Sequence, residues 1–207
     1  MRVISELGNL VFSEEVDRWV WKENVDGGFT QKSLWEATRA KAPRVSLAKW
    51  LWSTKNVPRH AFVTWLLFQN KLSTRDRLCR WGMHVSTQCV FCSCSESQEH
   101  LFFACEFTAQ LWRLVLQKLG LYRRTCGWQQ ERAWCIEYLK GRSLKRRIGQ
   151  IALMSTVHTI WMERNGRVFG GVASFLDRLY YRILNDVYTE LAPGEELRRP
   201  SKIRWLA

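Results

Sequence analysis

Four residues in one stretch most constrain the fold that this chain can adopt, because their side chains are of the kinds that bind metal ions. Cys89 and Cys92 are separated by two residues, and His100 and Cys105 follow on a second element. A closely spaced cysteine pair can turn two sulfurs toward one metal ion. The histidine and the third cysteine then complete the set of four ligands. Three thiolates and one imidazole fill a tetrahedral shell and leave no position for substrate. The array therefore predicts a structural zinc ion, Zn²⁺, in a knuckle.

The spacing of the second pair predicts where a helix must end. His100 and Cys105 are five residues apart, which places them about 140° apart around an ideal helix. We expect a helix that begins between residues 95 and 98 and carries His100, with Cys105 at or just past its C-terminus. Chelation is then expected to unfold the segment from about Arg80 to Leu111. The alternative is a set of buried thiols beside one hydrogen-bonded histidine.

Composition favours a folded protein that resides inside a cell. The 207 residues are 46% hydrophobic and include 12 Trp, which is ample for a packed core. Seven cysteines are an odd number, and the first residues lack an apolar secretory signal, so we expect an intracellular, reducing compartment. No apolar run approaches the roughly twenty residues of a membrane-spanning helix, and no membrane partner is expected.

An excess of positive charge indicates a polyanionic partner. Thirty-two Lys and Arg against 19 Asp and Glu give a formal net charge of +13, which favours nucleic acid, either RNA or DNA. The alternative for any one run of charge is a solvated helix end. We name the densest run the basic cluster and predict that it contacts phosphate; its residues are Lys140, Arg142, Lys145, Arg146 and Arg147.

The pattern of apolar residues and turn signals predicts a mainly α fold. A small N-terminal β-hairpin is expected between Asp17 and Phe29, around Asp26-Gly27-Gly28. A helical core with a Cys3His zinc knuckle and further C-terminal helices follow. The predicted divisions are a poorly defined segment (1–16), a zinc-binding domain (17–120), a helical extension (121–171), and a C-terminal helix with a basic tail (172–207).

Capping residues and periodicity place the individual helices. Helices are expected after Thr30, from Pro58 to about 69, after Ser73 or Thr74, over 108–119 and 128–139, from 144 to about 164, and after Ser174. Tryptophans in apolar patterns are expected in the core; these are Trp19, Trp21, Trp35, Trp50, Trp52, Trp65, Trp112 and Trp161.

The order of several motifs resembles a known family. Gly28-Phe29-Thr30, the segments 52–58 and 65–82, the Cys89/Cys92 pair, and Glu99 to Cys105 occur in sequence. Over residues 17–115 they are similar to the zinc-binding domain that follows the reverse transcriptase in plant LINE-type (non-LTR) retrotransposons. The resemblance implies the same four zinc ligands and a detached C-terminal piece of such an element.

Two positions depart from the family pattern. The family usually has a proline just after the last cysteine, where this chain has Glu106, and Cys94 is an additional thiol behind Cys92. Cys92 and Cys94 would form a tight chelate on one metal, so we expect Cys94 to be free.

These observations together predict a non-catalytic zinc-binding module of retrotransposon origin that assists nucleic-acid binding. An enzyme is not expected, because no two Asp residues adjoin and the glycines at 166–171 lack the Lys-Ser/Thr of a phosphate-binding loop. Two alternatives remain: a protein-interaction or scaffold domain that packed against a polymerase, and a decayed remnant without activity.

Overall fold

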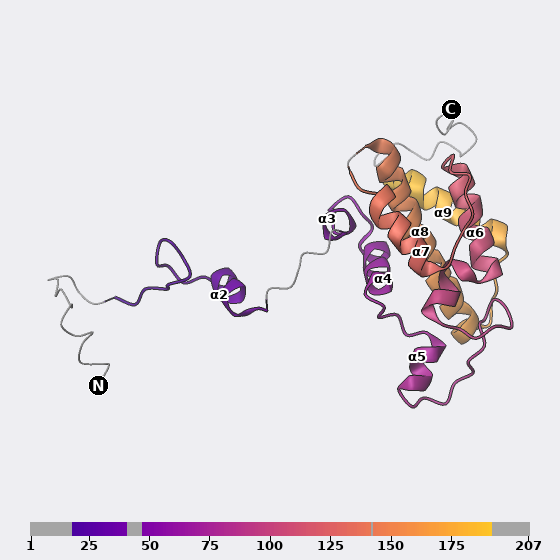
Figure 1. Cartoon of the computed structure of the whole chain (residues 1–207), viewed down its shortest axis with the longest axis horizontal. Coiled ribbons are helices and arrows are strands. Elements are labelled where there is room, and N and C mark those ends of the chain that lie inside the picture. The colour runs from indigo at the N-terminus through magenta and orange to yellow at the C-terminus, as the bar shows by residue number, and fades with distance from the viewer. Residues whose placement is uncertain (1–17, 41–46, 142, 192–207) are drawn as a thin grey trace. The chain divides into compact units, whose positions relative to one another are not determined.

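The structure, a computed structural model, describes residues 18–40, 47–141 and 143–191. Its described residues are mainly helical and include one isolated bridge but no strand, so the expected mainly α class is confirmed. The chain divides into two compact units, Met1–Arg44 and Val45–Ala207, which are described separately (Figure 1). No helix of the described residues is long and apolar enough to cross a membrane.

The first unit contains one described helix, α2 (Gln31–Thr38). Its N-cap is Thr30, as predicted: the Ser33 N–H donates to Thr30 Oγ1 at 3.0 Å, and the Thr30 N–H donates to Ser33 Oγ at 3.2 Å. Before this helix, the Trp21 N–H donates to the Gly27 carbonyl at 2.9 Å and closes a turn. The predicted hairpin begins at residue 17, outside the described residues, and is not confirmed.

The second unit is a helical bundle built around one long helix. Its elements are α3 (Ala48–Leu51), α4 (Pro58–Phe68), α5 (Arg75–Arg80), η1 (His100–Ala104), α6 (Glu106–Lys118), α7 (Trp128–Tyr138), α8 (Leu144–Asn165), η2 (Gly166–Gly170) and α9 (Leu176–Leu191). Helix α8 packs against α4, α6 and α9 (Figure 1). Every residue of α8 from Ile148 to Ile160 is buried, so this helix forms the centre of the core.

The predicted helix starts agree closely with these elements. Pro58 occupies the first turn of α4, where its missing N–H has no partner to lose. Helix α9 buries Leu179, Ile183 and Val187 at intervals of four, which is the spacing of one helix face. The predicted domain divisions after residues 120 and 171 fall inside the second unit and stay predictions.

The prediction that tryptophans in apolar patterns lie in the core is right for Trp112 and wrong for several others. Trp112 is fully buried, whereas Trp19, Trp35 and Trp52 are exposed. An apolar pattern identifies which residues prefer to leave water, but the space available in the core decides which of them do.

Candidate metal centre

Residues 83–99, within the loop between α5 and η1, bring the first two cysteines together, and we name this segment the knuckle loop. The Cys89 N–H donates to the Cys94 carbonyl and the Glu96 N–H to the Thr87 carbonyl, both at 2.7 Å. A bridge between residues 88 and 95 lies between these bonds. The Phe91 N–H points at the Cys89 sulfur at 3.4 Å. The loop therefore folds back on itself, with its first thiol fixed by the backbone.

The second pair of residues meets the first because the helix ends between them. In η1, Phe102 has φ −100° and ψ 98°, and Phe103 has φ 78°, in the left-handed region. The Cys105 N–H then donates to the His100 carbonyl at 2.7 Å. The predicted position of Cys105, just past the end of the element that carries His100, is confirmed.

The left-handed conformation at Phe103 is held by packing. Such a conformation costs a bulky residue on the order of 1–3 kcal/mol and persists only where the surroundings fix it. The Phe103 ring is 1% exposed and stacks on Trp112, with ring centroids 5.1 Å apart. It also lies 6.1 Å from Trp128 of α7. Core aromatics thus stabilise the bend that returns Cys105 to the other ligands.

Glu106, where the resembling family has proline, does not disturb this arrangement. Cys105 is the N-cap of α6, and Glu106 is its first residue. The first helical position suits proline, since no N–H bond is lost there. An acidic side chain is also favourable at that position, because it interacts with the positive end of the helix dipole. Either residue is therefore compatible with the same chain path.

The four predicted ligands form one cluster. One ligand atom from each of Cys89, Cys92, His100 and Cys105 lies within 4.8 Å of all the others, and Cys92 Sγ is 3.1 Å from His100 Nε2. Bond lengths to zinc place neighbouring ligands of a tetrahedral site roughly 3.5–3.8 Å apart. The donor set and its spacing fit one zinc ion with no fifth position. Cys94 is exposed and lies outside this cluster.

The protonation of these groups follows from their closeness and burial. Burial lowers the pKa of His100, while the nearby Glu96 carboxylate acts in the opposite direction. A neutral imidazole is the form that coordinates a metal. The hydrogen bond between Cys89 and Cys105 raises the pKa of Cys89 and lowers that of Cys105. Backbone N–H groups at the start of α6 also lower the pKa of Cys105, which favours its thiolate.

A buried ion pair fastens the knuckle loop to the core. Arg164 of α8 donates from Nη2 to Glu96 Oε1 at 2.7 Å, and the two side chains are 3% and 0% exposed. The Glu96 carboxylate also accepts the Arg75 N–H at 2.9 Å, and Gln98 donates to the Leu67 carbonyl at 3.0 Å. Sequence analysis missed this pair. Its members lie 68 residues apart and belong to no recognisable motif.

A second contact, made by Arg167 of η2, holds the same loop. The Arg167 guanidinium lies 4.7 Å from the centroid of Phe91 and 5.0 Å from that of Phe107. It also donates to Glu163 Oε1 at 2.9 Å and to the Ser174 carbonyl at 3.1 Å. Residues beyond α6 thus contact the knuckle loop directly.

The basic cluster lies at the start of α8, away from the cysteines in sequence. Lys145 and Arg146 are exposed, and Arg142 lies outside the described residues. Lys140 is exposed and pairs with Glu137 at 3.0 Å. Arg147 is half-buried, because it donates to Asn56 Oδ1 and, at 3.0 Å, to the Lys55 carbonyl. Arg146 also donates to the Lys140 carbonyl, so the cluster combines exposed cations with guanidinium groups that hold the backbone.

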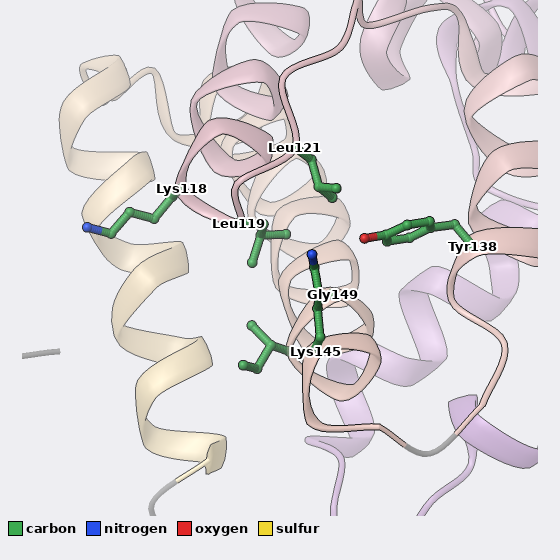
Figure 2. Close-up of a pocket in the computed structure, with 7 residues that line it drawn as sticks. Lys118, Leu119, Leu121, Tyr138, Lys145 and Gly149 are labelled. Atoms are coloured by element: carbon green, nitrogen blue, oxygen red, sulfur yellow. The ribbon is translucent and has the colours of Figure 1, made fainter. Parts of the chain in front are cut away.

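A small pocket adjoins this cluster (Figure 2). Lys145 lines it together with Leu119, Leu121, Ile148 and Tyr138. Figure 2 shows the Tyr138 hydroxyl directed inward, while the ammonium group of Lys118 points away. The walls are mainly aliphatic and hold none of the four cysteine and histidine ligands.

Comparison with known proteins agrees with this geometry. Residues 29–112 match the family model for zinc-binding in reverse transcriptase. The match begins just before α2, includes all four residues of the Cys3His cluster, and ends at Trp112 in α6. It supports a reverse transcriptase zinc-binding domain in this part of the chain, and together with the cluster it suggests zinc as the metal. No curated protein and no solved structure matches the chain.

Proposed function

We propose that this protein is a non-catalytic zinc-binding module that assists nucleic-acid binding. The observation that carries the proposal is the convergence of Cys89, Cys92, His100 and Cys105 inside the segment that matches the reverse transcriptase zinc-binding model. Four protein ligands close the coordination shell, which is the arrangement of a structural site and not of a catalytic one.

The residues around the cluster have separate roles in this proposal. Bound zinc would join the knuckle loop to the start of α6. Glu96 and Arg167 orient the loop against α8, and Phe103 sets the return of the chain to Cys105. Basic residues outside the shell neutralise phosphate charge.

The basic cluster is a suitable phosphate contact for a physical reason. Lys145, Arg146 and Arg147 occupy the first turn of α8, which contains no acidic residue. Cations there repel the positive end of the helix dipole, and an anion would relieve that repulsion. With a formal net charge of +13, the whole chain attracts polyanions in the same way.

We further propose that the domain originates from a plant LINE-type retrotransposon. The ordered motifs from Gly28 to Cys105 support this origin, as does the match to a reverse transcriptase domain. Sequences of related elements that carry the same motifs beside a polymerase would test it.

Metal analysis tests the zinc part of the proposal. Protein expressed with ample metal should contain about one equivalent of zinc, because a closed structural site fills under such conditions. The matched control is Cys94→Ser, which changes an exposed thiol of the same loop and should keep the metal. A zinc content below about half an equivalent in the unaltered protein would reject the metal site.

A salt titration tests the nucleic-acid part. Binding to RNA or DNA should weaken steeply with salt, and the double variant Lys145→Ala/Arg146→Ala should reduce the slope of log K against log salt by about 1.4 on single strands. Lys22→Ala/Lys32→Ala removes the same charge from the first unit and serves as the control. Undetectable or salt-insensitive binding would reject this role, and binding to a polymerase chain alone would favour the scaffold alternative.

A further inference from the structure

Three aromatic side chains lie together on the outer surface of α3 and α4, and we name them the aromatic platform: Trp52, Phe62 and Trp65. The Phe62 ring stacks on Trp65 with centroids 6.2 Å apart and 25° between planes. The Trp52 ring lies 6.3 Å from Trp65 on the same surface. Trp65 packs against the core, whereas Trp52 and Phe62 are each 49% exposed. The platform thus presents Trp52 and Phe62 to solvent, and Trp65 beneath them anchors it to the core.

The platform is held in place by the loop between α3 and α4. Asn56 is buried and donates to the carbonyls of Trp50 at 2.6 Å and Leu51 at 2.8 Å. Its carboxamide oxygen accepts from Arg147 of α8, which also donates to the Lys55 carbonyl at 3.0 Å. The same arginine that belongs to the basic cluster therefore fastens this loop. The loop that carries the platform is thus joined to the start of α8, where the basic cluster lies.

The segment that carries the platform contains cations and no acidic residue. No Asp or Glu occurs from residue 37 to residue 75, while Lys55 and Arg59 are exposed within this range. The Lys71 ammonium lies 5.6 Å from the Trp65 ring centroid. Exposed aromatic rings on a segment with these three cations complement a polyanion that carries planar groups, and they do not complement an uncharged apolar protein surface.

We propose that the aromatic platform binds unpaired bases of a single-stranded nucleic acid, with Trp52 and Phe62 as the stacking residues. A duplex hides the faces of its bases, so stacking on these side chains requires an unpaired strand. The basic cluster and the lysines beside the platform contact the phosphates of the same strand. This inference rests on the proposed nucleic-acid function and adds the form of the strand and the place where it binds.

Fluorescence anisotropy on the zinc-loaded full chain tests the inference, with a labelled single-stranded oligonucleotide and its duplex as probes. The double variant Trp52→Ala/Phe62→Ala should lose at least about tenfold in affinity for the single strand, because each stacked base contributes appreciably. Its affinity for the duplex should change by less than about twofold, since phosphate contacts remain. The conservative variant Trp52→Phe/Phe62→Tyr should keep most of the single-strand affinity.

Trp81→Ala/Phe175→Ala is the matched control, because these side chains are 61% and 86% exposed and lie outside the platform. The control should bind both probes as the unaltered protein does. Circular dichroism and zinc content establish that each variant is folded, and Trp52→Ala alone replaces the double variant if the latter is not. An unchanged single-strand affinity, or an equal loss for both probes, overturns the inference while the proposed function stands. Absence of binding by the unaltered protein at low salt overturns both.

Discussion

The knuckle loop meets helix α8 through the Glu96–Arg164 pair, yet the two regions are ordered by different forces. All residues of α8 from Ile148 to Ile160 are buried, so hydrophobic burial alone stabilises this helix strongly. In the knuckle loop, residues 83–99, the buried residues are Cys89, Glu96 and Gln98, and none is a large hydrocarbon. Apart from the partly buried Phe91, the loop therefore depends on polar contacts and on the ligands of a metal, whereas α8 does not.

The largest expected effect comes from removing one ligand of the Cys3His cluster. Cys92→Ser should lower the zinc content below about half an equivalent, because a structural site loses affinity with each thiolate. Hydrogen exchange should then show loss of protection in residues 83–99, while α8 keeps its protection. The sequence predicts that the whole segment from Arg80 to Leu111 unfolds when zinc is removed. Leu101, Phe102 and Leu111 are buried in the core, however, and should retain order.

Cys94→Ser is the control for this comparison, since Cys94 is exposed in the same loop and lies outside the cluster. It should leave the zinc content and the exchange pattern unchanged. If Cys92→Ser instead unfolds α8 as completely as the loop, the two regions are one cooperative unit and the distinction between them fails.

The next largest effect is expected at the Glu96–Arg164 ion pair, which joins the knuckle loop to α8. Glu96→Gln leaves the Arg164 guanidinium buried without a carboxylate, which should lower the free energy of unfolding by about 3–5 kcal/mol. Urea unfolding followed by circular dichroism measures this change. The control is Glu137→Gln, whose partner Lys140 is exposed, and which should cost less than about 1 kcal/mol. Equal effects of the two substitutions would show that burial does not strengthen the Glu96 pair.

Much of this arrangement could be predicted from the sequence. The four ligands and the end of η1 follow from spacing, and the helix starts at Thr30 and Pro58 follow from capping chemistry. The left-handed bend at Phe103 and the Glu96–Arg164 pair could not be predicted, because they depend on contacts between segments far apart in the chain. The exposure of Trp52 could not be predicted either, since an apolar pattern does not show which side chains the core has room for.

A smaller effect is expected from His158, a buried histidine in the centre of α8. Burial, followed by the neighbouring His60 ring at 4.3 Å, lowers the pKa of His158 to about 4. The unfolded chain takes up a proton below about pH 6.5, but the folded chain does not until about pH 4. The stability that depends on this group is therefore fully present above pH 6.5 and is lost as the pH falls toward 4, by roughly 3 kcal/mol in all.

Urea unfolding at pH 7.5, 6 and 5 measures this dependence in the unaltered protein and in His158→Gln. Protonation of the zinc ligands contributes to the slope in both proteins, so the difference between their slopes isolates His158. The unaltered protein should lose more stability on acidification than the variant does. Identical slopes would mean that His158 is already accessible to protons in the folded state.

The smallest effect expected is at the contact between Arg167 and the rings on either side of it. Phe91→Leu keeps an apolar side chain in the knuckle loop but removes one ring 4.7 Å from the guanidinium, a loss of about 1 kcal/mol. Because the change lies in the loop and not in the core, it should speed zinc release to a chelator more than it lowers global stability. Phe169→Leu, at an exposed position, is the control and should alter neither quantity. A loss of global stability with unchanged zinc release would place Phe91 with the core and not with the metal-dependent loop.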